Sequence, residues 1–378
     1  MTISFLEGSR AIAQTIANIQ PDVVSAYPIT PQTHIVEDLA RFKAEKKADY
    51  EYLLAESEAA AASIVLGASA AGARVYTATS SQGLLLMLEV LYNAAGLRLP
   101  LVMTVANRAV GAPINIWNDH SDAMAMRDAG WVMLFAENHQ EAVDLHVIAY
   151  RLAESTNLPV AVNVDGFILT HSHESVIIPD NKTIKKILPD YLPTDGAFLD
   201  TKNPTTIGGF FTSEHYWLER KQLDTDLKNA LPLISKLYKQ WKKILPTPSP
   251  VKAKFENGLL EYCGPSHPET LIIAMGSMAG TIKETIKDNK SVGLLKIRSF
   301  RPFPDIRQFT TSCKHIAVVE KAMSSGASGP LYAEVGSSLY NYKGVLSDNI
   351  VGLGGRDVSL QTIKHIIKSS GKAGIKFW

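Results

Sequence analysis

Short apolar segments alternate with helical patterns over the first 175 residues of this 378-residue chain. The strand-length segments are continuously apolar and partly β-branched, instead of alternating between apolar and polar residues. Continuous apolar strands separated by helices are typical of a parallel sheet covered by helices on both faces. We therefore predict an α/β fold with strands over 22–26, 51–54, 74–79, 99–105, 131–135 and 160–164, and helices over 8–18, 32–44, 58–71, 83–94 and 139–154.

The pattern changes twice after residue 175. Prolines and lysines are frequent from about 176 to 250, and residues 213–244 have the pattern of a long helix with a polar face. The Pro-rich segment 244–250 is typical of a stiff linker. A second strand and helix pattern begins near residue 269, with strands over 271–274, 292–297 and 316–319 and helices over 278–287 and 360–368. We predict domains over 1–240 (with an extended arm from about 176) and 261–378, joined by a linker over 241–260.

Composition excludes several classes of protein. Lys+Arg is 38 and Asp+Glu is 37, so no strong field for nucleic acid or an anionic membrane is expected. The two cysteines, Cys263 and Cys313, are far apart and form no CxxC pair, which argues against a disulfide framework or an iron–sulfur cluster built by this chain alone. The sequence shows neither a signal peptide nor an apolar run of the roughly 20 residues needed to cross a bilayer. We expect a cytoplasmic protein.

Three polar segments follow predicted strands, where the ligands of parallel sheets bind. The first is Tyr27-Pro28-Ile29-Thr30-Pro31. The two prolines restrict the backbone around Thr30, so its hydroxyl could meet a ligand at low entropic cost. Alternatively, Thr30 only caps the helix that follows, as threonine often does.

The second segment is the acidic, alanine-rich run at 56–62. Ser57 is a plausible N-cap, which places Glu58 in the first turn of its helix. The helix dipole there favours the ionised carboxylate, whereas burial favours the neutral acid. Thiamine diphosphate enzymes use such a carboxyl against N1′ of the aminopyrimidine. The alternative is an exposed carboxylate at a helix start, and Glu56 competes with Glu58 for either role.

The third segment contains Arg108, whose guanidinium could clamp a substrate carboxylate through paired hydrogen bonds or could be an ordinary surface arginine. Residues 118–122 contain carboxylates and an imidazole, and we interpret them as a helix entry capped by Ser121 or Asp119 rather than as a metal site. In the second part, the glycine-rich turn at 276–281 could bind a phosphate, but close packing of the strand and helix is the better interpretation. The turn at 352–357 is equally ambiguous.

Taken together, these segments resemble the 2-oxoacid:ferredoxin oxidoreductase family, and within it the α subunits that act on pyruvate. The similar motifs run in family order over nearly the whole chain: Tyr-Pro-Ile-Thr-Pro at 27–31, Ser-Glu-Ala-Ala at 57–60, Ser-Gln-Gly-Leu-Leu-Leu-Met at 81–87, Asn-Arg-Ala at 107–109, Ile-Trp-Asn-Asp-His at 116–120, Val-Asp-Gly-Phe at 164–167 and Gly-Leu-Gly-Gly-Arg-Asp at 352–357.

The resemblance implies a thiamine-diphosphate-binding fold of the pyrimidine-binding type, followed by a transketolase C-terminal-like α/β domain. It implies that Glu58, rather than Glu56, contacts the aminopyrimidine, and that Thr30 and Arg108 hold the 2-oxoacid. The implied reaction is oxidative decarboxylation of pyruvate to acetyl-coenzyme A and CO₂, with electrons passed to ferredoxin. No metal ligand is expected in this chain.

Thiamine enzymes anchor the diphosphate through Mg²⁺ on a Gly-Asp-Gly motif, which is missing here, since neither Asp165-Gly166 nor Asp195-Gly196 has a preceding glycine. The resemblance therefore implies that a β subunit holds the diphosphate, the Mg²⁺ and a cluster. It also implies two clusters in a δ subunit and a coenzyme A role for a γ subunit. A different 2-oxoacid (2-oxoglutarate, a branched or aryl oxoacid, or oxalate) and a non-catalytic scaffold remain alternatives. The sequence leaves the direction of the reaction and the number of heteromeric units open.

Overall fold

The first sheet lies at the centre of the N-terminal part of the protein, described here from a computed structural model that places residues 3–247, 251 and 253–378. Its seven strands follow the order β13-β6-β7-β5-β4-β2-β3. Six of them are parallel: β2 (Val23–Ala26), β3 (Glu51–Leu54), β4 (Val75–Thr79), β5 (Leu101–Asn107), β6 (Val132–Phe135) and β7 (Val160–Asp165). Each overlaps a predicted strand, so the predicted parallel sheet is confirmed.

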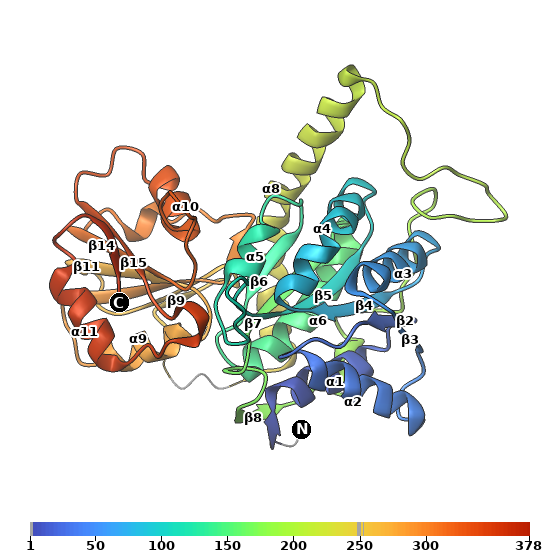
Figure 1. Cartoon of the computed structure of the whole chain (residues 1–378), viewed down its shortest axis with the longest axis horizontal. Helices are drawn as coiled ribbons and strands as arrows, with labels where there is room; N and C mark the ends of the chain where they lie inside the picture. Colours follow the sequence, from blue (N-terminus) through green and yellow to red (C-terminus); the bar gives the residue numbers. More distant parts are fainter. Residues whose placement is uncertain (1–2, 248–250, 252) are drawn as a thin grey trace.

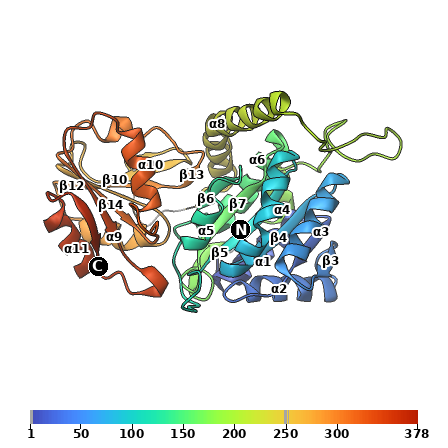
Figure 2. The same ribbon diagram turned by 45° about the horizontal axis from the view of Figure 1, so that its top comes forward.

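Helices cover both faces of this sheet, as Figures 1 and 2 show. One layer contains α3 (Glu58–Ala70), α4 (Ser81–Gly96) and the short α5 (Ser121–Ala125). The other contains α1 (Gly8–Ile19), α6 (His139–Thr156) and α8 (Ser213–Ile244), with α2 (Thr33–Ala44) beside α1. Strands β4, β5, β6 and β7 are consequently buried at every position, which explains why they are continuously apolar, whereas the edge strand β3 is largely exposed.

Two features of the N-terminal part were not predicted. An antiparallel pair, β1 (Ile3–Glu7) and β8 (His173–Ile177), forms a separate two-stranded sheet, and α7 (Asn181–Ile184) follows it.

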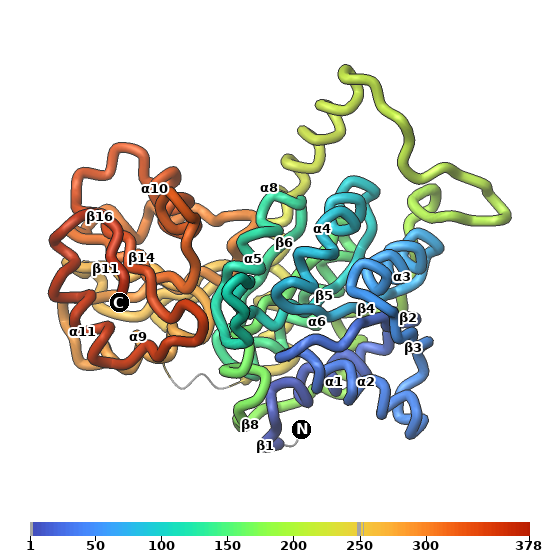
Figure 3. The backbone as a smooth tube through the Cα atoms, viewed as in Figure 1, coloured from blue at the N-terminus to red at the C-terminus, as the bar shows by residue number. Residues whose placement is uncertain are grey.

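The long helix α8 has the bounds that the sequence predicts and packs on α6. Figure 3 shows that the segment before α8 projects from the body of the protein, and Phe210 within it is 99% exposed.

The second sheet lies in the C-terminal part, in the order β16-β15-β14-β11-β12-β10-β9. Its strands are β9 (Phe255–Glu256), β10 (Leu260–Cys263), β11 (Thr270–Ala274), β12 (Val292–Ile297), β14 (His315–Glu320), β15 (Val345–Ile350) and β16 (Gly374–Phe377). Strand β10 pairs antiparallel with both β9 and β12, and the four other pairs of this sheet are parallel. The helices are α9 (Met278–Ile286), α10 (Pro330–Ser338) and α11 (Leu360–Ser369).

The sequence predicts β11, β12, β14, α9 and α11 but not the other elements of this part. Strand β9 and the start of β10 lie inside the segment predicted as a linker, and residues 248–250 and 252 of that segment lie outside the described residues. The domain boundaries at 240 and 261 stay a prediction.

The two parts share one sheet edge and one core. Strand β13 (Ser299–Arg301) comes from the C-terminal half yet pairs antiparallel with β6 of the first sheet. Beside this pair, Phe300 packs edge-on against Phe135, with ring centroids 6.3 Å apart. Among the described residues, no helix is long and apolar enough to cross a membrane.

Candidate active site

Glu58 is the first residue of α3 and lies in a buried position, with 7% of the residue exposed. Ser57 is the N-cap, and its hydroxyl oxygen accepts the backbone N–H of Ala60 at 3.2 Å. Glu56 is exposed. The two carboxylates therefore differ in exposure. The Ser57 cap fixes the start of the helix, and of the two only Glu58 is turned toward the interior.

The carboxylate of Glu58 packs on Gly83, in the first turn of α4. A Cβ atom added to Gly83 would lie 2.6 Å from Glu58 Oε1 and 2.7 Å from the hydroxyl of Thr79. Within the part of the chain that the structure describes, Glu58 receives no hydrogen bond, and the buried Thr79 hydroxyl has no partner. The two oxygen-bearing side chains thus meet over a glycine, and neither is saturated by protein contacts.

Arg108 and Thr30 are in direct contact at the carboxyl edge of the sheet. Arg108 follows β5, and its Nη1 donates to the backbone carbonyl of Thr30 at 2.9 Å, while Nε donates to the carbonyl of Asn115 at 3.0 Å. Burial lowers the pKa of Arg108, and the nearby Asp122 carboxylate raises it. Arg108 Nη2 has no partner among the described residues. This donor is consequently left to bind a ligand.

Thr30 does not cap α2, so the capping alternative is wrong. The helix begins at Thr33, and its N-cap is Gln32, which makes no side-chain capping hydrogen bond. Thr30 is exposed, and its hydroxyl has no partner among the residues described. Gly166 packs closely against the turn that carries Thr30. A Cβ atom added to Gly166 would lie 2.6 Å from Pro31 and 2.5 Å from the carbonyl oxygen of Asn107.

Asp122 joins the loops that carry these side chains, although sequence reasoning gave it no role. Its Oδ2 accepts the backbone N–H groups of Ser81 and Arg108, both at 2.9 Å, and its Oδ1 accepts from Asn107 Nδ2 at 3.1 Å. Burial raises the pKa of Asp122 to about 6, against the lowering effect of these hydrogen bonds. One buried carboxylate thus fixes the ends of β4 and β5 relative to each other. Asp119 accepts the N–H of Ser121, but the N-cap of α5 is His120.

Asp165 connects the site to the C-terminal part. Its carboxylate accepts from Lys321 Nζ at 2.9 Å and from the backbone N–H of Ser277 at 3.1 Å, and it lies 2.7 Å from Nε2 of His120. Burial acts to raise its pKa, but the Lys321 ammonium and His120 hold the pKa of Asp165 below its usual range. The start of α9 is therefore occupied by a carboxylate of the first part, in agreement with the packing interpretation of the 276–281 turn.

The 352–357 turn has a similar docking role. The side-chain amide of Asn115 donates to the carbonyl of Gly354 at 3.1 Å, and the N–H of Gly355 donates to the carbonyl of Asn118 at 2.7 Å. Since Asn115 also receives the hydrogen bond from Arg108, the C-terminal part supports the loop that holds the guanidinium.

The structure thus brings Thr30 and Arg108 into contact. Glu58 packs on Gly83 in the first turn of α4, and Asp122 joins the start of that helix, at Ser81, to Arg108. Thr30 follows β2, Gly83 follows β4 and Arg108 follows β5, and these strands are neighbours in the sheet. Sequence reasoning missed Asp122 and Lys321. The only available signal for Asp122 was its place directly after the Ile-Trp-Asn-Asp-His motif.

Comparison with known families identifies the two parts. Residues 14–239 match the family described as "Pyruvate flavodoxin/ferredoxin oxidoreductase, thiamine diP-bdg", and residues 268–363 match "Pyruvate:ferredoxin oxidoreductase core domain II". The first match places the helix-covered sheet in the class of thiamine diphosphate-binding domains. The chain belongs to the pyruvate flavodoxin/ferredoxin oxidoreductase family.

Two curated relatives and one solved structure show how far the similarity extends. The chain is 44% identical to pyruvate synthase subunit PorA of Methanocaldococcus jannaschii, over 98% of this chain and 95% of the relative. It is 37% identical to ketoisovalerate oxidoreductase subunit VorA of Pyrococcus horikoshii, over 97% and 93%. The solved 2-oxoglutarate:ferredoxin oxidoreductase from Magnetococcus marinus has a TM-score of 0.72 at 21% identity over 98% of this chain. The present chain spans 65% of that solved chain, and the likeness supports the fold.

Proposed function

We propose that this chain is the α subunit of a pyruvate:ferredoxin oxidoreductase, also called pyruvate synthase, with Glu58, Thr30 and Arg108 as its active-site residues. The observation that carries the proposal is the buried Glu58 carboxylate, which lies without a hydrogen-bond partner among the described residues, inside a domain of the thiamine diphosphate-binding class. The near full-length similarity to a pyruvate synthase subunit supports it.

The residues around Glu58 fit the aminopyrimidine of thiamine diphosphate. Gly83 leaves room for the Glu58 carboxylate beside α4, and the buried Thr79 hydroxyl lacks a partner among the described residues. When bound, thiamine diphosphate supplies the nucleophilic carbon and the electron sink that decarboxylation of a 2-oxoacid requires. In this arrangement Glu58 holds a proton against the aminopyrimidine N1′ and orients the ring, while its burial excludes water from that contact.

Arg108 and Thr30 provide the groups for the 2-oxoacid. Arg108 Nη2, which has no partner in the described part of the chain, binds the substrate carboxylate, and the exposed hydroxyl of Thr30 donates to the oxo oxygen. The hydrogen bond from Arg108 Nη1 to the Thr30 backbone carbonyl holds the guanidinium next to the residue that carries this hydroxyl. The guanidinium is therefore oriented before the substrate binds.

The proposal includes partner subunits. A β subunit holds the diphosphate and Mg²⁺, iron–sulfur clusters lie in partner subunits only, and γ and δ subunits complete the complex that uses coenzyme A and reduces ferredoxin. Two features support this division. Asp165, in one of the two Asp-Gly pairs, is bonded to Lys321 and is not free for Mg²⁺. Burial also raises the pKa of Cys263 and Cys313 to about 11, which disfavours the thiolates that clusters need. The cytoplasmic location expected from the sequence stays a prediction.

A second candidate is the same chemistry on a branched 2-oxoacid. The relative named as a ketoisovalerate oxidoreductase subunit matches nearly the whole chain at 37% identity. Both substrates present the same carboxylate and oxo group to Arg108 and Thr30, so these residues suit either one.

The test is to purify the tagged chain from its host without oxygen and to follow viologen reduction with a panel of 2-oxoacids, with and without coenzyme A. Co-purifying iron–sulfur subunits and reduction that depends on pyruvate and coenzyme A support the proposal. If viologen is reduced faster with a branched 2-oxoacid than with pyruvate, that 2-oxoacid is the substrate instead of pyruvate. A chain that purifies without partners and without activity refutes the proposal in favour of a scaffold.

A further inference from the structure

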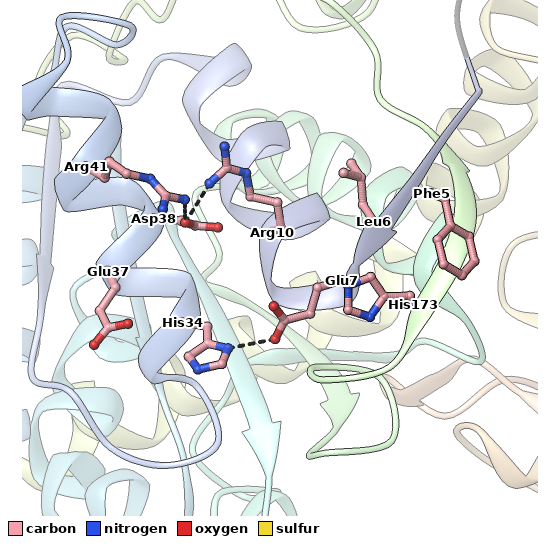
Figure 4. Close-up of a pocket in the computed structure, with 9 residues that line it drawn as sticks. All are labelled: Phe5, Leu6, Glu7, Arg10, His34, Glu37, Asp38, Arg41 and His173. Carbon is pink, nitrogen blue, oxygen red and sulfur yellow. Dashed lines mark hydrogen bonds and ion pairs between the residues drawn. The ribbon is translucent and has the colours of Figure 1, made fainter.

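Glu7 and His34 line the pocket shown in Figure 4, and together with His171 they form a cluster of three potential metal ligands. Glu7 ends β1, His34 lies in the first turn of α2, and His171 lies in the loop between β7 and β8. Each offers one ligand atom, and the three atoms all lie within 4.8 Å of one another. We propose that these three side chains form a binding site for one Zn²⁺ ion.

The spacing of the ligand atoms suits a tetrahedral ion. Zn²⁺ binds imidazole nitrogen and carboxylate oxygen at about 2.0–2.2 Å, which separates neighbouring ligand atoms by roughly 3.3 Å. Glu7 Oε1 and His34 Nδ1 are 2.7 Å apart, and the rings of His34 and His171 have centroids 4.6 Å apart. The first pair has to open slightly, and side-chain rotation of His171 brings its ligand atom, which lies within 4.8 Å of the other two, to the required distance. The ion then replaces the proton that joins Glu7 to His34.

A neighbouring hydroxyl orients the ring of His171. Its Nδ1 lies 2.7 Å from the hydroxyl oxygen of Thr170, which also accepts the backbone N–H of Phe167. When Nδ1–H donates to Thr170, Nε2 keeps its lone pair for a metal, as in other sites where a second hydrogen bond orients a ligating histidine.

The surroundings allow a cation and a water ligand. The pocket beside Glu7 and His34 has a volume of about 450 Å³. Figure 4 shows that Arg10 and Arg41, which line the same pocket, are both turned toward Asp38. Asp38 offsets one of these two positive charges, and the carboxylates of Glu7 and Glu37 line the same pocket. Glu7 and the two imidazoles leave a fourth tetrahedral position for a water molecule from this pocket. A bound ion would tie β1, α2 and the loop after β7 together.

The site is tested by adding Zn²⁺ to the full-length chain at about pH 7.5 in competition with a chromogenic chelator. The wild type should bind one Zn²⁺, whereas Glu7→Gln and His171→Ala should bind it at least about tenfold more weakly. His173→Ala is the matched control, since His173 lines the same pocket but lies outside the cluster. Co²⁺ provides an optical readout, because a tetrahedral Co²⁺ complex absorbs strongly in the visible range.

Folding is monitored in the same samples by circular dichroism and thermal unfolding. Zn²⁺ should raise the Tm of the wild type and of His173→Ala but not that of Glu7→Gln, in which a neutral amide can still hydrogen-bond to His34. Absence of Zn²⁺ binding at concentrations below about 0.1 mM in the folded wild type overturns the proposal. Equal Zn²⁺ affinity in the wild type, Glu7→Gln and His171→Ala also overturns it, because the ion would then bind elsewhere.

Discussion

Arg108 is fixed to Thr30 by a hydrogen bond from its Nη1 to the Thr30 backbone carbonyl oxygen, 2.9 Å away. A second hydrogen bond, from Nε to the carbonyl of Asn115, holds the other side of the guanidinium. Both acceptors are main-chain atoms, so the direction of the remaining donor is set by the backbone of two loops. A planar guanidinium held in this way binds a carboxylate with little further loss of freedom.

Replacing Arg108 by alanine should raise KM for pyruvate by about 10–100-fold, because a charge-assisted contact to the substrate carboxylate is lost. Steady-state viologen reduction by the assembled complex measures this effect. Arg127→Ala, which removes a partly exposed arginine paired with Asp128, should leave KM unchanged. An unaltered KM in Arg108→Ala would return Arg108 to a structural role.

Replacing Glu58 by glutamine should lower kcat by roughly 10²–10⁴-fold while the protein folds normally, since the amide cannot hold the acidic proton that the aminopyrimidine contact needs. The control is Glu56→Gln, because Glu56 is an exposed carboxylate only two residues away. Activity is measured at saturating pyruvate, and folding by circular dichroism. Comparable turnover in the two variants would remove Glu58 from the mechanism.

Gly83→Ala should impair activity through Glu58 without any direct loss of a functional group. The added methyl would lie 2.6 Å from Glu58 Oε1, so the carboxylate has to leave its place. Gly67→Ala is a matched control on α3, because nothing lies within 4 Å of a Cβ at that position, and there alanine should stabilise the helix by roughly 0.5–1 kcal/mol. A fully active Gly83→Ala enzyme would show that the Glu58–Gly83 contact is dispensable.

Stability should fall as the pH rises toward 8 because of Glu320. This carboxyl accepts the backbone N–H groups of Leu331 and Tyr332 at the start of α10. Burial raises its pKa to about 8, an effect to which the neighbouring Asp348 contributes. In the unfolded chain this carboxyl has its ordinary pKa of 4.5, so the folded state keeps a proton that the unfolded state releases above that pH. The resulting stabilisation is complete below pH 4.5 and is lost as the pH rises through about 8.

Urea unfolding at about pH 5, 6.5 and 8 measures this dependence. The wild type should lose a few kcal/mol of unfolding free energy across the series. Glu320→Gln, which cannot titrate, should show a shallower decline. Identical slopes in the two proteins would contradict a protonated Glu320 in the folded state.

Local sequence signals predicted the first sheet and the position of Glu58 well. Continuous apolar strands and the Ser57 cap depend on residues that are neighbours in the sequence. The Ser57 cap, for example, accepts a hydrogen bond from a residue only three positions away. Strand β15 was missed because its sequence does not look like a buried strand: Ser347, Asp348 and Asn349 are all fully buried. Their hydrogen bonds reach distant segments, as when Asn349 Nδ2 donates to the carbonyl of Val318 at 3.1 Å.

The contacts that organise the candidate site were harder to foresee for a related reason. Lys321 and Asp165 are 156 positions apart in the sequence, and Asn115 and the carbonyl of Gly354 are 239 apart. Neither spacing has a periodicity that a sequence can display. Arg108 was identified from its place after a strand, but the carbonyl groups that orient it belong to loops whose approach only the folded chain defines.

Because β13 of the C-terminal half completes the sheet of the N-terminal half, the two halves cannot be separated without breaking that sheet. If the chain were divided between residues 244 and 255, the N-terminal fragment would keep β6 as an unpaired sheet edge, and Phe135 would lose the ring of Phe300. Open edges of this kind favour aggregation. The two fragments would therefore have to be produced together to give a well-behaved protein, and a hybrid that takes its C-terminal half from a relative needs a compatible strand at 299–301.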